Sequence, residues 1–130
     1  MEIPANVKVY DFSSAVMWLD EAGILCSVSK KAPAQTVEEA RETLEEFKKI
    51  TGGRKVCMLL DITNSQPNTK EIRDFAAEEI RKIAKAIAMI SSSALGKMIA
   101  NLYFGLKPPT YPAKMFTNEQ DARNWLKQYL

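Results

Sequence analysis

Asp61 is an acidic side chain in an otherwise apolar setting, because it directly follows the run Val56–Leu60 (VCMLL). A carboxylate in such a place can act as a general base or bind a cation. It can also accept hydrogen bonds from backbone amides of the loop that follows, as aspartates often do in turns. No second carboxylate lies close to it in the sequence, so paired acid–base chemistry has no support and we favour the turn.

The sequence contains no histidine, which narrows the possible chemistry further. Histidine is the side chain most often used as a general base near neutral pH and as a metal ligand. Nucleophile pairs of the Ser–His or Cys–His kind therefore cannot form within the chain. Cys26 and Cys57 lie in apolar strand-like runs, where we expect free buried thiols, with a disulfide between neighbouring strands as the alternative. We predict no enzymatic activity, no metal and no cofactor.

The loop after this apolar run carries hydroxyl and amide side chains that suit contacts with a partner. Together with Asp61 it offers Thr63, Asn64, Ser65, Asn68 and Thr69. A helix follows, for which we predict Asn68 as the N-cap, with Glu71 in the capping-box position. A phosphate on Thr69 would lie at the N-terminus of that helix, which favours anions, beside Lys70 and Arg73. The simpler interpretation is that Asn68 and Thr69 only cap the helix.

A serine-rich turn, residues 91–97 (SSSALGK), is a second place where backbone amides could hold an anion. It lacks the leading glycine, and the Ser or Thr after the lysine, of a phosphate-binding loop. We therefore interpret it as the start of a helix capped by a serine.

Residues 98–112 are the better candidate for an apolar contact. They include four large side chains that cannot all face inward easily, namely Tyr103, Phe104, Leu106 and Tyr111. Pro108, Pro109 and Pro112 hold the segment extended. Aromatic side chains that are ordered in advance suit a protein interface or the mouth of an apolar pocket. A self-association surface and ordinary packing over the core both stay open.

The elements that must position these residues alternate between strands and helices. Apolar runs bounded by turn residues predict strands, and apolar stripes with spacings of three and four predict helices. The expected strands cover residues 7–10, 15–19, 24–29, 55–62, 86–90 and 113–117. The expected helices cover residues 36–50, 68–83 and 94–104, and a last helix starts at residue 118.

This alternation predicts a single α/β domain over residues 1–130. We expect an N-terminal β-hairpin followed by four strand–helix turns, with a mostly parallel sheet and helices packed over it. The unbroken apolar run before Asp61 predicts a central strand. N-caps are expected at Thr36 and Asn118, each with an acidic residue three positions later.

Composition limits the class of protein. The 130 residues carry a net charge of +2, with 46% hydrophobic and 26% charged residues, as in an ordinary globular protein. So small a net charge predicts no nucleic-acid partner and no attachment to an anionic membrane. No apolar run approaches the ~18 residues that span a bilayer, and the first residues lack the pattern of a signal peptide. We expect a cytoplasmic protein.

The order of elements resembles the STAS-like fold of bacterial anti-sigma-factor antagonists and of the cytoplasmic domains of sulphate transporters. The resemblance covers nearly the whole chain. Three features carry it: the strand ending in Leu-Leu-Asp-Ile-Thr at residues 59–63, the strand 86–90 with its small-residue turn, and the closing segment 115–126. That closing segment is also similar to uncharacterised bacterial STAS-like proteins grouped with the CRAL-TRIO lipid-binding fold.

The resemblance implies a non-enzymatic regulatory or protein-interaction module whose contact surface includes the loop Thr63–Thr69 and the helix that follows. The partner is another protein or a second copy of the chain, and we expect a homodimer. In the antagonists, an Asp-Ser pair starts the helix after the central strand, and phosphorylation of the serine releases the partner. This chain has no such pair at the matching place, where Thr69 is the nearest hydroxyl. The CRAL-TRIO likeness implies an alternative, a carrier or sensor of a small apolar or lipid-like ligand.

Overall fold

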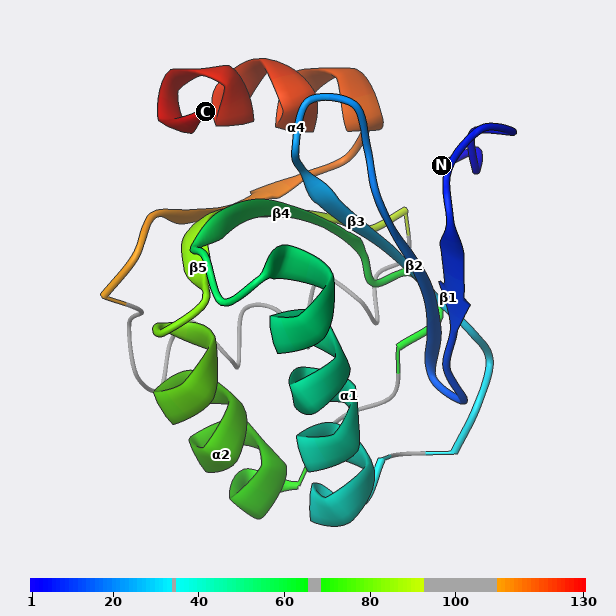
Figure 1. The fold of residues 1–130 in the computed structure, drawn as a ribbon, viewed down its shortest axis with the longest axis vertical. Coiled ribbons are helices and arrows are strands. Elements are labelled where there is room, and N and C mark those ends of the chain that lie inside the picture. The colour runs from blue at the N-terminus through cyan, green and yellow to red at the C-terminus, as the bar shows by residue number, and fades with distance from the viewer. Residues whose placement is uncertain (34, 66–68, 93–109) are drawn as a thin grey trace.

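The protein, represented by a computed structural model, is built on one six-stranded β-sheet (Figure 1). The structure describes residues 1–33, 35–65, 69–92 and 110–130. The strands are β1 (Val9–Asp11), β2 (Ala15–Leu19), β3 (Leu25–Ser29), β4 (Val56–Asp61), β5 (Ala84–Ile90) and β6 (Ala113–Phe116). They lie in the sheet in the same order as in the sequence.

The sheet is antiparallel at its N-terminal side and parallel over the rest. Strands β1 to β3 pair antiparallel, and strands β3 to β6 pair parallel. β2 and β3 form the expected hairpin, with Leu19 opposite Leu25 beside a turn in which Gly23 has a φ of 82°. A side chain would strain that backbone conformation, which explains the glycine. The structure thus confirms the hairpin and the mostly parallel sheet.

Helices cover both faces of the sheet and give the molecule three layers (Figure 1). α1 (Val37–Thr51) and α2 (Lys70–Ile80) lie against each other on one face. α4 (Glu119–Leu126), extended by the 3₁₀ turn Lys127–Tyr129, lies on the other face against β5. In the described ranges, no helix is long and apolar enough to cross a membrane.

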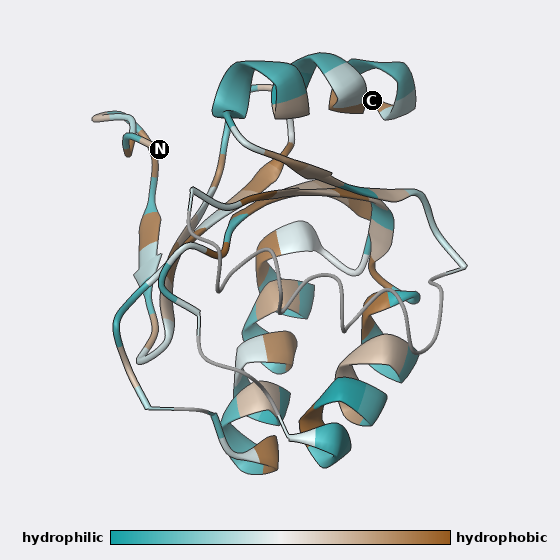
Figure 2. Ribbon diagram, turned by 180° about the vertical axis from the view of Figure 1, so that it is seen from behind, coloured by the Kyte–Doolittle hydropathy of each residue, from teal (hydrophilic) through white to brown (hydrophobic). Residues whose placement is uncertain are grey.

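Strand β4 is buried on both faces, and its side chains alternate between two core clusters. Cys57 and Leu59 belong to the cluster on the α4 side, and Val56 and Met58 to the cluster on the α1–α2 side. Figure 2 shows this layering as hydrophobic colour along the strands and much hydrophilic colour on the helices. A strand that is covered on both faces requires an unbroken apolar run, which is what the sequence has.

Side-chain caps set the starts of α1 and α4 where they were predicted. Thr36 Oγ1 accepts a hydrogen bond from the N–H of Glu39 at 3.1 Å. Asn118 Oδ1 accepts one from the N–H of Asp121 at 2.9 Å. Each bond gives a partner to an amide group that the first helical turn leaves unpaired.

Helix α2 starts one residue later than predicted. Its N-cap is Thr69 and not Asn68, which lies outside the described residues. Thr69 Oγ1 accepts a hydrogen bond from the N–H of Ile72 at 3.3 Å. Asparagine and threonine are both favourable N-caps, so two adjacent candidates cannot be ranked from the sequence.

The other end of α2 and two strand starts also differ from the predictions. α2 ends at Ile80 instead of Ile83, because Ile83 is buried in the core and its carbonyl accepts the N–H of Val56 at 3.0 Å. β5 therefore begins at Ala84, two residues earlier than expected. β1 covers residues 9–11 instead of 7–10. The helix predicted over residues 94–104 lies outside the described residues.

The double burial of β4 predicts a large effect of truncating its side chains. Leu59 is fully buried, so Leu59→Ala should lower the free energy of unfolding by about 2–5 kcal/mol, through lost burial and the cavity left behind. Leu130→Ala is the matched control, because Leu130 is 53% exposed, and it should change that free energy by less than about 0.5 kcal/mol. Urea unfolding of both variants measures the difference, and equal effects would contradict the assignment of β4 as the central strand.

Candidate functional site

The end of strand β4 forms an ordered turn around Asp61. Asp61 Oδ1 accepts a hydrogen bond from the N–H of Thr63 at 3.0 Å, which is the turn hydrogen bond expected for this residue. The other carboxylate oxygen lies 3.8 Å from the α-amino group of Met1. In the described part of the chain, no group of three or more His, Cys, Asp or Glu residues could hold a metal ion. The carboxylate therefore has structural partners on both of its oxygens.

The residues after Asp61 are tied to the strands on either side of β4. The N–H of Asn64 donates to Ser29 Oγ at the end of β3 at 3.0 Å, and its side-chain amide donates to the Ser29 carbonyl at 3.4 Å. Thr63 Oγ1 accepts the N–H of Ser92, after β5, at 3.4 Å. Residues 61–65 are thus hydrogen-bonded to the segments on both sides of β4. We name the surface formed by residues 61–65, Thr69 and the first turn of α2 the docking edge.

Thr69 combines two properties that matter for this surface. Its hydroxyl caps α2, as described above, and the residue is exposed. Lys70 next to it forms an ion pair with Asp74, its Nζ lying 3.2 Å from the carboxylate. Capping alone explains why a threonine stands at this position, so no phosphorylation is needed to explain it. The neighbouring Lys70 already has an anionic partner in Asp74.

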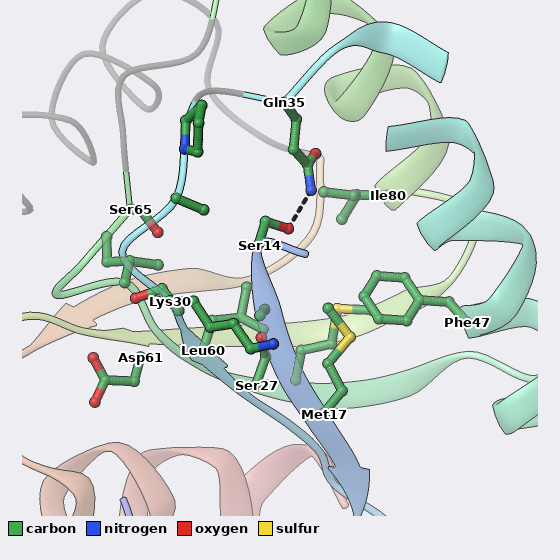
Figure 3. A pocket seen from close by; sticks show the side chains of 16 residues that line it. Ser14, Met17, Ser27, Lys30, Gln35, Phe47, Leu60, Asp61, Ser65 and Ile80 are labelled. Carbon is green, nitrogen blue, oxygen red and sulfur yellow. Dashed lines mark hydrogen bonds between the residues drawn. The ribbon is translucent and has the colours of Figure 1, made fainter. Parts of the chain in front are cut away.

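A cavity of about 200 Å³ lies between the sheet and the α1–α2 layer, beside the docking edge (Figure 3). Its apolar walls come mainly from Ala15, Met17, Phe47, Met58, Leu60, Ile62 and Ile80. Asp61, Ile62 and Ser65 of the docking edge also border it. Figure 3 shows the carboxylate of Asp61 pointing away from the other labelled side chains, so this residue adds no charge to the interior. The docking edge and the cavity are therefore neighbours that share residues.

The polar side chains of the cavity are mostly engaged with other parts of the protein. Gln35 donates from its side-chain amide to Ser14 Oγ, and the ammonium group of Lys30 binds the Asp11 carboxylate. The hydroxyls of Ser27 and Ser65 differ, because neither has a hydrogen-bond partner among the described residues, and Ser27 is the more deeply buried of the two, with 7% of its surface exposed.

The sequence does not predict this cavity. The groups that form it lie in β2, β3, β4, α1 and α2, and helical or strand periodicity does not reveal the space left between them. One signal was present: Ser27 and Ser29 place two small polar side chains on the same face of an otherwise apolar strand.

A second polar cluster that was not predicted joins α4 to the hairpin. Arg123 donates to Asp20 Oδ2 at 2.8 Å and to Glu119 Oε1 at 3.0 Å, and its guanidinium lies 3.7 Å from Cys26 Sγ. Burial, followed by the charge of Asp20, raises the pKa of the Cys26 thiol to about 12. The thiol is therefore protonated at neutral pH, and the cluster has the character of a structural clamp. Cys26 and Cys57 are both buried free thiols, as expected.

The predicted aromatic patch lies only partly in the described chain. Tyr111 is buried in the core cluster on the α1–α2 side, with 9% of its surface exposed. Tyr103, Phe104 and Leu106 lie outside the described residues. Tyr111 is thus a core residue in this structure, and the use of the other three as an interface stays a prediction.

The arrangement of sheet and helices is that of the SpoIIAA-like, or STAS-like, class of folds. A solved structure of an uncharacterised DUF3478-family protein from Shewanella loihica PV-4, described as having a SpoIIAA-like fold, superposes with a TM-score of 0.58 at 15% sequence identity. The alignment covers 97% of this chain and 98% of that one. At such low identity the likeness establishes the fold, which confirms the STAS-like resemblance, and leaves activity open.

The chain belongs to the family DUF7793, a domain of unknown function, whose pattern matches residues 17–130. A protein of unknown function from Arthrobacter sp. FB24 is 24% identical over 93% of this chain and 98% of that one, but superposes with a TM-score of only 0.34 and carries no argument here. No curated protein matches the sequence.

The cap at Thr69 gives a test of the docking edge's local structure. Thr69→Ala should lower the free energy of unfolding by about 1 kcal/mol, because the N–H of Ile72 loses its acceptor. Thr69→Ser keeps the hydroxyl and should restore most of the loss. Urea unfolding measures both variants, and an unchanged midpoint in the alanine variant would show that Thr69 does not act as the cap.

Proposed function

We propose that this domain is a non-enzymatic regulatory module that binds a protein partner through the docking edge. The proposal rests on the hydrogen bonds that hold residues 61–65 in place. Asn64 is bonded to Ser29 at the end of β3, and Thr63 is bonded to Ser92 after β5. A surface that is ordered before binding loses little conformational entropy when a partner docks. The loop beyond the carboxyl end of a central parallel strand is also the usual place for contacts in open α/β sheets.

The groups with potential for chemistry also favour binding over catalysis. Asp61, the carboxylate best placed for acid–base work, already accepts a hydrogen bond from the Thr63 amide. The Cys26 thiol is held in its protonated form by burial, so it is a poor nucleophile. The two free thiols are compatible with a reducing compartment, and the proposal includes a cytoplasmic location. A second copy of this chain is the first partner to test.

Site-specific photo-crosslinking tests the docking edge. A benzophenone amino acid is placed at Lys70, on the docking edge, or at Lys49 near the end of α1, whose side chains are 82% and 74% exposed. We expect Lys70 to yield a defined crosslinked species in native cells, either with a partner or with a second copy, and Lys49 to yield none. Lys70→Glu in a tagged chain should reduce capture of the same species several-fold.

Two results would refute the docking edge. One is the absence of any specific crosslink from Lys70, combined with a monomer in sedimentation velocity. The other is the same set of crosslinked species from both positions, which would indicate random collisions. Circular dichroism of each variant shows whether the fold is retained.

The cavity supports a second candidate function, the carrier or sensor of a small apolar ligand. Its volume of about 200 Å³ exceeds that of a cavity of roughly 150 Å³ that is known to bind benzene. Its apolar lining is what a binding site for a small molecule requires. The likeness of the closing segment to CRAL-TRIO-type proteins adds to this proposal.

Native mass spectrometry of protein purified from its own cells tests the carrier function. We expect a fraction of the molecules to carry an added mass of a small compound, which organic extraction removes. Leu60→Trp places a larger side chain into the cavity wall and should abolish the added mass, whereas Leu130→Trp, at an exposed position, should leave it unchanged. Protein that is free of ligand in every preparation would count against a carrier.

A further inference from the structure

The hydroxyl of Ser27 occupies an unusual position in the sheet. Ser27 lies in β3, opposite Met17 of β2 on one side and Leu60 of β4 on the other. Neither neighbouring side chain offers a strong hydrogen-bond partner, since one is a thioether and the other an alkyl group. The residue is 7% exposed, lines the cavity and has no partner for its hydroxyl among the described residues (Figure 3).

An unpaired hydroxyl in such a place has an energetic cost. Leaving a buried donor or acceptor without a partner costs about 1–3 kcal/mol, and native interiors give a partner to most such groups. The oxygen of Ser27 keeps some accessible surface beside the cavity, so a polar atom of an occupant can become its hydrogen-bond partner. The position of Ser27 thus indicates that the occupant carries a hydrogen-bonding group.

The charges around the cavity indicate that this occupant is neutral. Among the described residues that line the cavity, Lys30 carries the one ammonium group, and that group is bound to Asp11. The carboxylate of Asp61 points away from the interior and accepts the N–H of Thr63 (Figure 3). A charged ligand would lose its hydration here without gaining a free counter-charge from the part of the chain that the structure describes, which is unfavourable.

The walls limit the size and shape of the occupant. About 200 Å³ is room for a single six-membered ring with a few additional atoms, given that benzene fits a cavity of roughly 150 Å³. The thioethers of Met17 and Met58 and the ring of Phe47 line this space. Methionine side chains adapt to aromatic rings and make favourable sulfur–aromatic contacts.

We propose that the cavity binds a neutral ligand of about one ring, bearing a single hydroxyl or carbonyl group that hydrogen-bonds to the hydroxyl of Ser27. The inference rests on the carrier or sensor function proposed above and specifies its ligand class. It assigns to Ser27 the role of polar anchor and to Met17, Met58 and Phe47 the role of apolar contacts.

Phenol and toluene form a matched pair of probes, because they differ mainly in a hydroxyl in place of a methyl group. Titration of each into protein labelled with ¹³C at the methionine methyl groups gives its Kd. Shifts should concentrate on Met17 and Met58, while Met115 in β6, which does not line the cavity, serves as the internal control. Ser27→Ala should weaken phenol binding roughly three- to tenfold, the loss of one hydrogen bond, and leave toluene binding unchanged or slightly tighter.

Ser13→Ala is the control variant, because Ser13 is exposed and outside the cavity, and it should alter neither Kd. In the unaltered protein, nuclear Overhauser effects between the phenol ring and the β-protons of Ser27 test the contact without any substitution. If both probes bind at Met17 and Met58 but Ser27→Ala leaves phenol unaffected, the anchor is refuted and the carrier function survives. If neither probe shifts these methyl groups, both the ligand class and the carrier function are refuted.

Discussion

The structure depends on the burial of strand β4 between two helical layers. A strand in this position cannot use water to satisfy its backbone or its side chains, so it must be apolar until the sheet ends. Asp61 marks the point where this burial stops, and its carboxylate accepts the first free amide of the turn, that of Thr63. The order of the docking edge is therefore a direct result of ending a doubly covered strand without leaving polar groups unpaired.

The cavity and the docking edge are related through strand β3. Ser27 and Ser29, two residues apart on the same face of β3, both line the cavity, and Ser29 also accepts the N–H of Asn64 from the docking edge. An occupant that shifts β3 would therefore change the position of Asn64. Any such coupling is reciprocal by thermodynamic linkage, so a partner on the docking edge would change the affinity of the cavity for its ligand by the same factor.

The sequence predicts the sheet far better than the spaces around it. Periodicity locates the hairpin and the unbroken run of β4, because both follow from which faces are covered. It does not separate Asn68 from Thr69 as a cap, since both side chains suit that position, and it overextends α2 to Ile83, because a buried turn residue continues the helical stripe by chance. The cavity and the Arg123 clamp are formed by side chains that are far apart in the sequence. Periodicity along the chain does not show which of these side chains lie close together in space.

The position of α4 in the chain has a consequence during synthesis on the ribosome. α1 and α2 are made before β6, whereas α4 follows β6, and its clamp joins Arg123 to Asp20 across 103 residues. Until α4 has emerged, Trp18 and Leu59 lack the layer that belongs over their face of the sheet. A nascent chain in which the core cluster on the α4 side is still uncovered exposes apolar surface, and such surface favours aggregation. We therefore expect ribosome-bound chains that end before residue 119 to depend on chaperones, with that dependence relieved only when α4 is complete.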